Sequence, residues 1–218
     1  MKKILIPTDF SENAFVALHY VTQLFAATPC EFTIVHSFEK QVTNLTSRID
    51  IGKTEAVVED LYVATENKCE EVKERIIAAQ HNENHTFKTI ATSLSLTRAV
   101  NKLIIKEEID FVCMGSKGRT AAEDILLGSN TLGMIRSIKN AALLVVPKDM
   151  VYRKLENIAF ATGLKRSFSQ NELQPLLFLS ESNAASIKII HVQKSERKTE
   201  QQRENFNTLL HILKPGKP

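Results

Sequence analysis

The chain is 218 residues long, and 43% of its residues are hydrophobic while 24% are charged, as is common in globular proteins. This composition excludes a wholly disordered chain, and the lack of any apolar run of about 18 residues predicts that no helix spans a membrane. Residues 1–150 contain 17 Lys and Arg against 19 Asp and Glu, whereas residues 151–218 contain 11 against 6. This change in charge balance predicts two units, which we place at residues 1–149 and 150–218.

Within the first unit, apolar runs of strand length alternate with amphipathic stretches of helix length. The expected strands are KKILIPT (2–8), EFTIVHSF (31–38), TFKTIATS (86–93), IDFVCMG (109–115) and ALLVVP (142–147). The expected helices cover 11–27, 54–80, 96–108 and 129–140, and a polar stretch at 39–53 is expected to be a loop. Apolar strands separated by helices are typical of a parallel sheet that is covered on both sides. The crossover rule then predicts an α/β fold, namely a doubly wound five-stranded parallel sheet of order 3-2-1-4-5 with helices on both faces.

The second unit repeats the opening of the first. NIAFATG (157–163) matches ILIPTD (4–9), and IKIIH (187–191) matches FTIVH (32–36). The two matches lie at nearly the same offset, 154 and 155 residues, which indicates an internal repeat and not a chance similarity. With helices expected at 173–184 and 203–213, residues 150–218 should form a partial repeat of the fold, its first β-α-β-α half.

A glycine-rich stretch, MGSKGRTAAEDILLGSNT (114–131), follows the fourth expected strand. Gly115, Gly118 and Gly128 have the spacing G-x2-G-x9-G, and Ser129 comes directly after them. Glycines permit positive φ angles and let backbone amides approach an anion closely. The pair Gly128-Ser129 would open a helix whose dipole favours negative charge. The stretch therefore predicts a phosphate cradle, and a glycine-rich turn without a ligand is the alternative that spacing alone leaves open.

Three other signatures do not fit the sequence. The frame from Gly128 to Gly133 lacks the lysine of a Walker loop, and the turn at residues 7–10 lacks the glycines of a dinucleotide fingerprint. His81 and His85 of HNENH have only asparagine and glutamate between them and no further acidic partner at metal-ligand spacing. A turn in contact with solvent is therefore favoured over a metal site, and no metal ligand is assigned.

The predicted strand order gives the glycine-rich stretch a place in the fold. Asp9 follows the first strand and Gly115 follows the fourth, and the strand order reverses between these two strands. In doubly wound sheets, ligands bind at the carboxyl ends of the strands beside such a reversal. A carboxylate and a glycine-rich loop that also carries Lys117 and Arg119 are therefore expected to meet in one crevice.

These residues bring out a family likeness. With ILIPTDFSENA at its start, MGSKGRTAAEDILLGS after the fourth strand and ALLVVP at the end of the first unit, the chain resembles the universal stress proteins, specifically their ATP-binding members. The likeness covers residues 1–147 and, as a half-unit, residues 153–213, which is similar to a tandem arrangement with an incomplete second domain. It implies ATP as the ligand, and Asp9 is the carboxylate best placed for an accompanying Mg²⁺.

The resemblance also implies a role for individual residues. The turn after the first strand would line the adenine and ribose side, the backbone of Val35 would meet adenine, and loop amides with the Ser129 hydroxyl would hold the phosphates. The expected nucleotide-binding set is Pro7, Thr8, Asp9, Val35, Met114, Gly115, Ser116, Gly118, Gly128, Ser129, Asn130 and Thr131. The family often has an apolar residue where Asn130 stands, which leaves only its backbone role. Asp9 could instead cap the first helix together with Ser11, and Ser129 is expected to be an N-cap with or without a ligand.

The expected function is a part in stress response through nucleotide-dependent conformation or assembly. Nothing in the sequence identifies an attacking group or a general base, so no catalytic residue is assigned and any ATP hydrolysis should be slow. Two other classes stay open, namely a nucleotide-hydrolysing or adenylyl-transferring enzyme of a related fold, and a ligand-free dimerisation module. The turn at residues 8–11 has neither the HxGH nor the SGGxDS pattern of adenylyl-transferring enzymes.

Partners and location follow from three further features. The uncharged run ALLVVP is expected at a sheet edge, where unpaired backbone groups predict a homodimer through residues 142–147. The basic second unit lacks interleaved aromatic residues, so no nucleic-acid partner is expected. Cys30, Cys69 and Cys113 form no CxxC pair and no secretory signal precedes them, which favours free thiols in the cytoplasm. Cys113 lies within a strand that should be buried on both faces, so we expect it to be inert.

Overall fold

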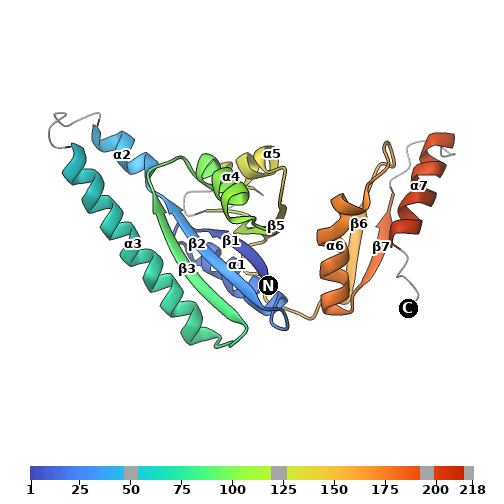
Figure 1. Cartoon of the computed structure of the whole chain (residues 1–218), viewed down its shortest axis with the longest axis horizontal. Coiled ribbons are helices and arrows are strands. Elements are labelled where there is room, and N and C mark those ends of the chain that lie inside the picture. Colours follow the sequence, from blue (N-terminus) through green and yellow to red (C-terminus); the bar gives the residue numbers. More distant parts are fainter. Residues whose placement is uncertain (47–53, 119–126, 192–198, 214–218) are drawn as a thin grey trace. The chain divides into compact units, whose positions relative to one another are not determined.

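The computed structural model describes residues 1–46, 54–118, 127–191 and 199–213 (Figure 1). The chain divides into two compact units, Met1–Tyr152 and Arg153–Pro218. Among the described residues, no helix combines the length and the hydropathy needed to cross a membrane.

The first unit is built on one parallel sheet of five strands in the order β3-β2-β1-β4-β5 (Figure 1). Its strands are β1 (Lys2–Pro7), β2 (Cys30–Ser37), β3 (His85–Thr92), β4 (Phe111–Gly115) and β5 (Ala142–Val146). The sheet confirms the predicted fold class and strand order. In β1, every residue from Ile4 to Pro7 is buried, because helices cover both faces of the sheet.

The helices of the first unit form two layers. They are α1 (Glu12–Leu24), α2 (Glu39–Thr46), α3 (Thr54–Ala79), α4 (Leu96–Glu107) and α5 (Ser129–Ser137). On one face, α4 and α5 close a core in which Leu5 of β1 packs with Val100 and Met134. On the other face, α1 and α3 pack on the sheet, and the rings of Phe25 and Phe111 meet there at 5.1 Å.

The first turn of α2 contradicts the loop predicted at residues 39–53, of which residues 47–53 lie outside the described residues. The side chain of Phe38 is buried, with 1% of its surface exposed. Its carbonyl accepts hydrogen bonds from the amides of Gln41 and Val42 at 2.9 and 3.1 Å. This buried residue starts the helix, and a search for helical periodicity fails to detect it because the segment after it is short and polar.

The second unit contains a parallel pair of strands, β6 (Asn157–Ala161) and β7 (Ser186–Ile190), with α6 (Gln170–Asn183) and α7 (Glu200–Leu213). In α6 the helix begins three residues before the predicted start at 173. Ser169 and Glu172 form a capping box there: the Ser169 hydroxyl accepts from the Glu172 amide, and the Glu172 carboxylate accepts from the Ser169 amide. This S-x-x-E pattern was the available signal for the helix start.

The two units share a detailed hydrogen-bond pattern at the carboxyl ends of their strands. In the first unit, His36 Nδ1 lies 2.7 Å from the carbonyl oxygen of Thr8. In the second unit, His191 Nδ1 lies 2.8 Å from the carbonyl oxygen of Thr162. Because a carbonyl only accepts, Nδ1 carries the proton in both histidines. The sequence match between the units therefore extends to equivalent contacts.

The burial of Cys113 leads to a first testable prediction. Its side chain is fully buried, its sulfur lies 3.7 Å from the Ala17 carbonyl, and burial raises the pKa of its thiol to about 12. Burial also raises the pKa values of Cys30 and Cys69 to about 12. All three thiols should therefore react slowly with an aromatic disulfide reagent in native buffer and rapidly in urea. Fast labelling of Cys113 in the native protein, located by peptide mass, would contradict this packing.

Candidate functional site

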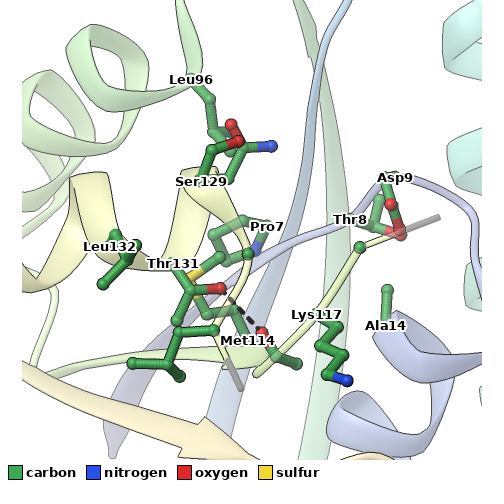
Figure 2. A pocket seen from close by; sticks show the side chains of 15 residues that line it. Pro7, Thr8, Asp9, Ala14, Leu96, Met114, Lys117, Ser129, Thr131 and Leu132 are labelled. Carbon is green, nitrogen blue, oxygen red and sulfur yellow. Dashed lines mark hydrogen bonds between the residues drawn. The ribbon is translucent and has the colours of Figure 1, made fainter. Parts of the chain in front are cut away.

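A cavity of about 400 Å³ opens where the carboxyl ends of β1 and β4 lie side by side (Figure 2). This volume falls within the usual range of small-ligand sites. Its walls come from the β1–α1 turn, the loop after β4 and the starts of α4 and α5. The described lining residues are Pro7, Thr8, Asp9, Ala14, Leu96, Met114, Gly115, Lys117, Gly118, Leu127, Gly128, Ser129, Asn130, Thr131 and Leu132.

Ten of the twelve residues expected to bind the nucleotide line this cavity, and Val35 and Ser116 do not. Val35 is fully buried, and its carbonyl accepts the Thr8 amide at 2.9 Å within the β1–β2 ladder. The Ser116 amide donates to the Val146 carbonyl at 2.7 Å. Both residues thus use backbone groups to hold the frame of the site. Arg119 lies outside the described residues.

Several lining residues were missed by the sequence analysis. Ala14, Leu96, Leu127 and Leu132 add apolar surface to the cavity. Leu96 is the first residue of α4, the helix that comes directly after β3 in the chain. The only available signal was topological, because loops at the same edge of a parallel sheet come together whatever their order in the sequence.

The β1–α1 turn fixes the orientation of Asp9. Ser11 is the N-cap of α1, and its hydroxyl accepts the Ala14 amide at 3.2 Å. Asp9 Oδ1 in turn accepts the Ser11 hydroxyl at 2.5 Å and the Ser11 amide at 3.1 Å. Through Oδ1, Asp9 therefore supports the helix cap with Ser11, as the alternative interpretation expected. The residue still lines the cavity.

Gly115 and Gly118 are closely packed, and neither has a positive φ angle. No described glycine has a positive φ, so this part of the expectation was wrong, and the left-handed residue of the adjoining β1–α1 turn is Phe10, with φ 62°. A Cβ on Gly118 would lie 2.7 Å from Asp9 Oδ2. A Cβ on Gly115 would lie 3.0 Å from the carbonyl oxygen of Asn13. At Gly115 the neighbour is backbone and has little room to move, whereas at Gly118 the Asp9 carboxylate would have to shift.

The start of α5 differs from the expected cap. Gly128 is the N-cap residue and makes no side-chain capping bond, so Ser129 is the first helical residue and not the N-cap. The Gly128 amide donates to the Ser116 carbonyl at 2.9 Å. Thr131 Oγ1 donates to the Gly115 carbonyl at 3.1 Å, the dashed line in Figure 2. These two bonds fix the end of α5 against β4, and they leave the first-turn amides of Ser129 and Asn130 without intrahelical acceptors.

The charges around the cavity favour a ligand that carries both an anionic group and polar groups. Lys117 and Asp9 are its charged lining residues within the described part of the chain. The dipole of α5 adds partial positive charge at its first turn. No group of three metal-ligating side chains occurs among the described residues.

The histidines of HNENH lie in different surroundings. His81 is exposed, whereas His85 is buried at the start of β3, and its Nε2 lies 3.2 Å from the Phe25 carbonyl. Burial lowers the pKa of His85, which favours the neutral ring. The prediction of a turn in contact with solvent thus fits His81, but it was wrong for His85.

Comparison with known proteins agrees with the observed fold. The family model of the universal stress protein family matches residues 1–147. The chain is 27% identical over 159 residues to universal stress protein MJ0577 of Methanocaldococcus jannaschii, covering 68% of this chain and 96% of that protein. The solved structure of MJ0577 superposes with a TM-score of 0.57 at 28% identity, covering 69% of this chain and 98% of that one.

A longer structure matches both units. A universal stress protein from Archaeoglobus fulgidus is 20% identical with a TM-score of 0.56, and the match covers 96% of this chain and 73% of that one. At this identity the match concerns the fold alone. The family model covers residues 1–147 of 218, and the sheet order, the Asp9 turn and the glycine-rich loop lie within that span. The chain therefore belongs to the universal stress protein family.

Proposed function

We propose that the first unit binds an adenine nucleotide, ATP in particular, and that the protein acts in stress response through nucleotide-dependent conformation or assembly. One observation carries the proposal: the cavity brings the Asp9 turn, the glycine-rich loop and the uncapped start of α5 to one place. Amides at a helix start are suited to phosphate oxygens, and apolar walls are suited to a base.

The cavity offers a distinct surface to each part of ATP. The phosphates lie at the amides of Ser129 and Asn130, with Lys117 adding charge from the loop. The ribose hydroxyls lie near the Asp9 carboxylate, whose orientation Ser11 sets. The base packs between apolar side chains from different elements, as in other nucleotide sites. Pro7, Met114 and Leu96 supply these side chains (Figure 2).

A catalytic role is less well supported than binding. Asp9 supplies the only carboxylate among the described lining residues, and its Oδ1 is engaged by Ser11. An accompanying Mg²⁺ would therefore rest mainly on phosphate oxygens and water, with Asp9 as the protein contact. No described lining residue is placed as a general base, so ATP hydrolysis, where it occurs, should be slow.

The second unit is proposed to be a partial domain of the same type. The shared histidine–threonine contacts of the two units support this, as does the match of both units to the longer Archaeoglobus fulgidus fold. Gly163 stands where the first unit has Asp9. We therefore assign it no nucleotide site.

Calorimetric titration with ATP tests the binding proposal. The alanine Cβ in Gly118→Ala would lie 2.7 Å from Asp9 Oδ2, so the short aspartate side chain must move while the fold persists. We expect affinity for ATP to fall about tenfold or more, which is ~1.4 kcal/mol. The matched control is Gly133→Ala, whose Cβ would meet Thr97 Oγ1 at an ordinary 3.6 Å. Absence of ATP binding by the wild type would favour the ligand-free module, and equal affinity in both variants would refute the role given to Asp9.

The edge of the sheet gives a second prediction. We propose a homodimer through residues 142–147, because β5 is an edge strand whose outer backbone groups lack partners within the sheet. Val145→Lys should convert the dimer into a monomer, as measured by sedimentation at micromolar concentration. Ile135→Lys on α5, at a side chain that is 50% exposed, is the matched control and should leave the dimer intact. A monomeric wild type, or a dimer that survives Val145→Lys, would rule out this interface.

A further inference from the structure

A second cavity, of about 370 Å³, lies on the α3 side of the β1–α1 turn. The turn contributes Phe10 and the end of β2 contributes His36, while Lys68, Glu71 and Val72 come from α3. None of its lining residues lines the first cavity. It is therefore a separate cavity that the proposed nucleotide binding does not use.

Two neighbouring rings, tilted against each other, line this second cavity. The ring centroids of Phe10 and His36 lie 4.3 Å apart with an angle of 31° between the planes. Phe10 has its left-handed conformation stabilised by a bond from its amide to Thr8 Oγ1 at 3.0 Å. An exposed aromatic surface of this kind favours a ligand that carries an aromatic ring.

The second unit shows the same turn in a closed form. Leu164 has φ 54°, and its amide donates to Thr162 Oγ1 at 3.1 Å, as the amide of Phe10 does to Thr8 Oγ1. Leu164 is only 1% exposed and packs in a core with Leu173 and Leu209. The turn itself therefore does not require open space beside it. In the first unit, Phe10 stays partly exposed and faces a cavity.

The charges of this cavity point to a ligand with one negative charge. Lys68 Nζ lies 5.9 Å from the Phe10 ring centroid, and within the described residues it forms no ion pair. Arg75, by contrast, is paired with Glu12 at 2.7 Å. Glu71 at the exposed rim disfavours a polyanion. Among the described residues, Lys68 thus offers a positive charge outside any ion pair, close to the Phe10 ring.

We propose that this second cavity binds a small aromatic monoanion, whose ring packs on Phe10 and whose acidic group meets Lys68. Occupancy is transmitted to the first cavity, because His36 contacts the ligand on one side and donates Nδ1–H to the Thr8 carbonyl at 2.7 Å on the other. Thr8 lines the first cavity. Only this regulatory part rests on the proposed nucleotide function.

Two probes that differ in charge test the site on the nucleotide-free full chain. Amide NMR signals are followed during titration with 3-phenylpropionate and with 2-phenylethylamine, which share a ring and carry opposite charges. We expect 3-phenylpropionate to shift the signals of Phe10, His36 and Lys68, and those of Thr8 and Asp9 through the shared turn. The amine should leave these signals unchanged at the same concentrations. Equal binding of both probes, or binding of neither, would overturn the proposal.

Variants of α3 locate the bound probe. Val72→Trp should fill the cavity and abolish the shifts, whereas Val63→Trp, at a side chain that is 48% exposed on the same helix, should retain them. Lys68→Gln is the milder change and should weaken the binding of 3-phenylpropionate about tenfold. Lys73→Gln removes a lysine that is instead paired with Glu70 and should have no effect. Unchanged affinity in both Lys68→Gln and Val72→Trp would place the probe elsewhere and refute the site.

The regulatory part is measured separately. Saturating 3-phenylpropionate should change the affinity for ATP by about fivefold or more, and ATP should change the affinity for the probe by the same factor. Probe binding without shifts at Thr8 and Asp9 would refute the coupling. Failure of ATP to bind would refute the proposed function, while the probe shifts would still decide whether the second cavity is a site.

Discussion

Parallel pairing of β1 with β4 determines where this protein can act. Ile4 and Leu5 pair with Phe111 and Val112, and the chain leaves both strands in the same direction. The strand order reverses at this pair, so no crossover helix fills the space beyond their carboxyl ends. The β1–α1 turn with Asp9 consequently lies in contact with the glycine-rich loop, although the two are about 105 residues apart in the sequence. The packing of Gly118 against Asp9 is a direct result.

The turn at residues 8–10 is part of the fold before it is part of a site. The second unit has a left-handed residue at the equivalent position, and it makes the same threonine and histidine contacts. That unit carries Gly163 in place of Asp9. The same turn geometry therefore forms with or without an aspartate at this position. In the first unit, Asp9 of this turn lines the first cavity and Phe10 lines the second.

The sequence was informative wherever one local pattern dictates one structure. Buried apolar strands, amphipathic helices and the spacing of Gly115, Gly118 and Gly128 predicted the sheet order and most of the cavity wall. The errors occurred where tertiary contacts decide. Phe38 starts a short helix because it is buried. Ser129 does not cap α5 because the chain reaches its N-cap one residue earlier, at Gly128. Neither the burial of Phe38 nor the position of this N-cap has a local sequence signature.

A crystal structure of the full chain grown with excess ATP tests the nucleotide site most directly. We expect phosphate density at the first turn of α5, beside Ser129 and Asn130, and a sugar next to Asp9. The base should pack against Pro7 and Met114 in the same cavity. Density for ATP at any other place, or an empty cavity at a concentration that saturates binding in solution, would contradict the assignment of this crevice as the nucleotide site.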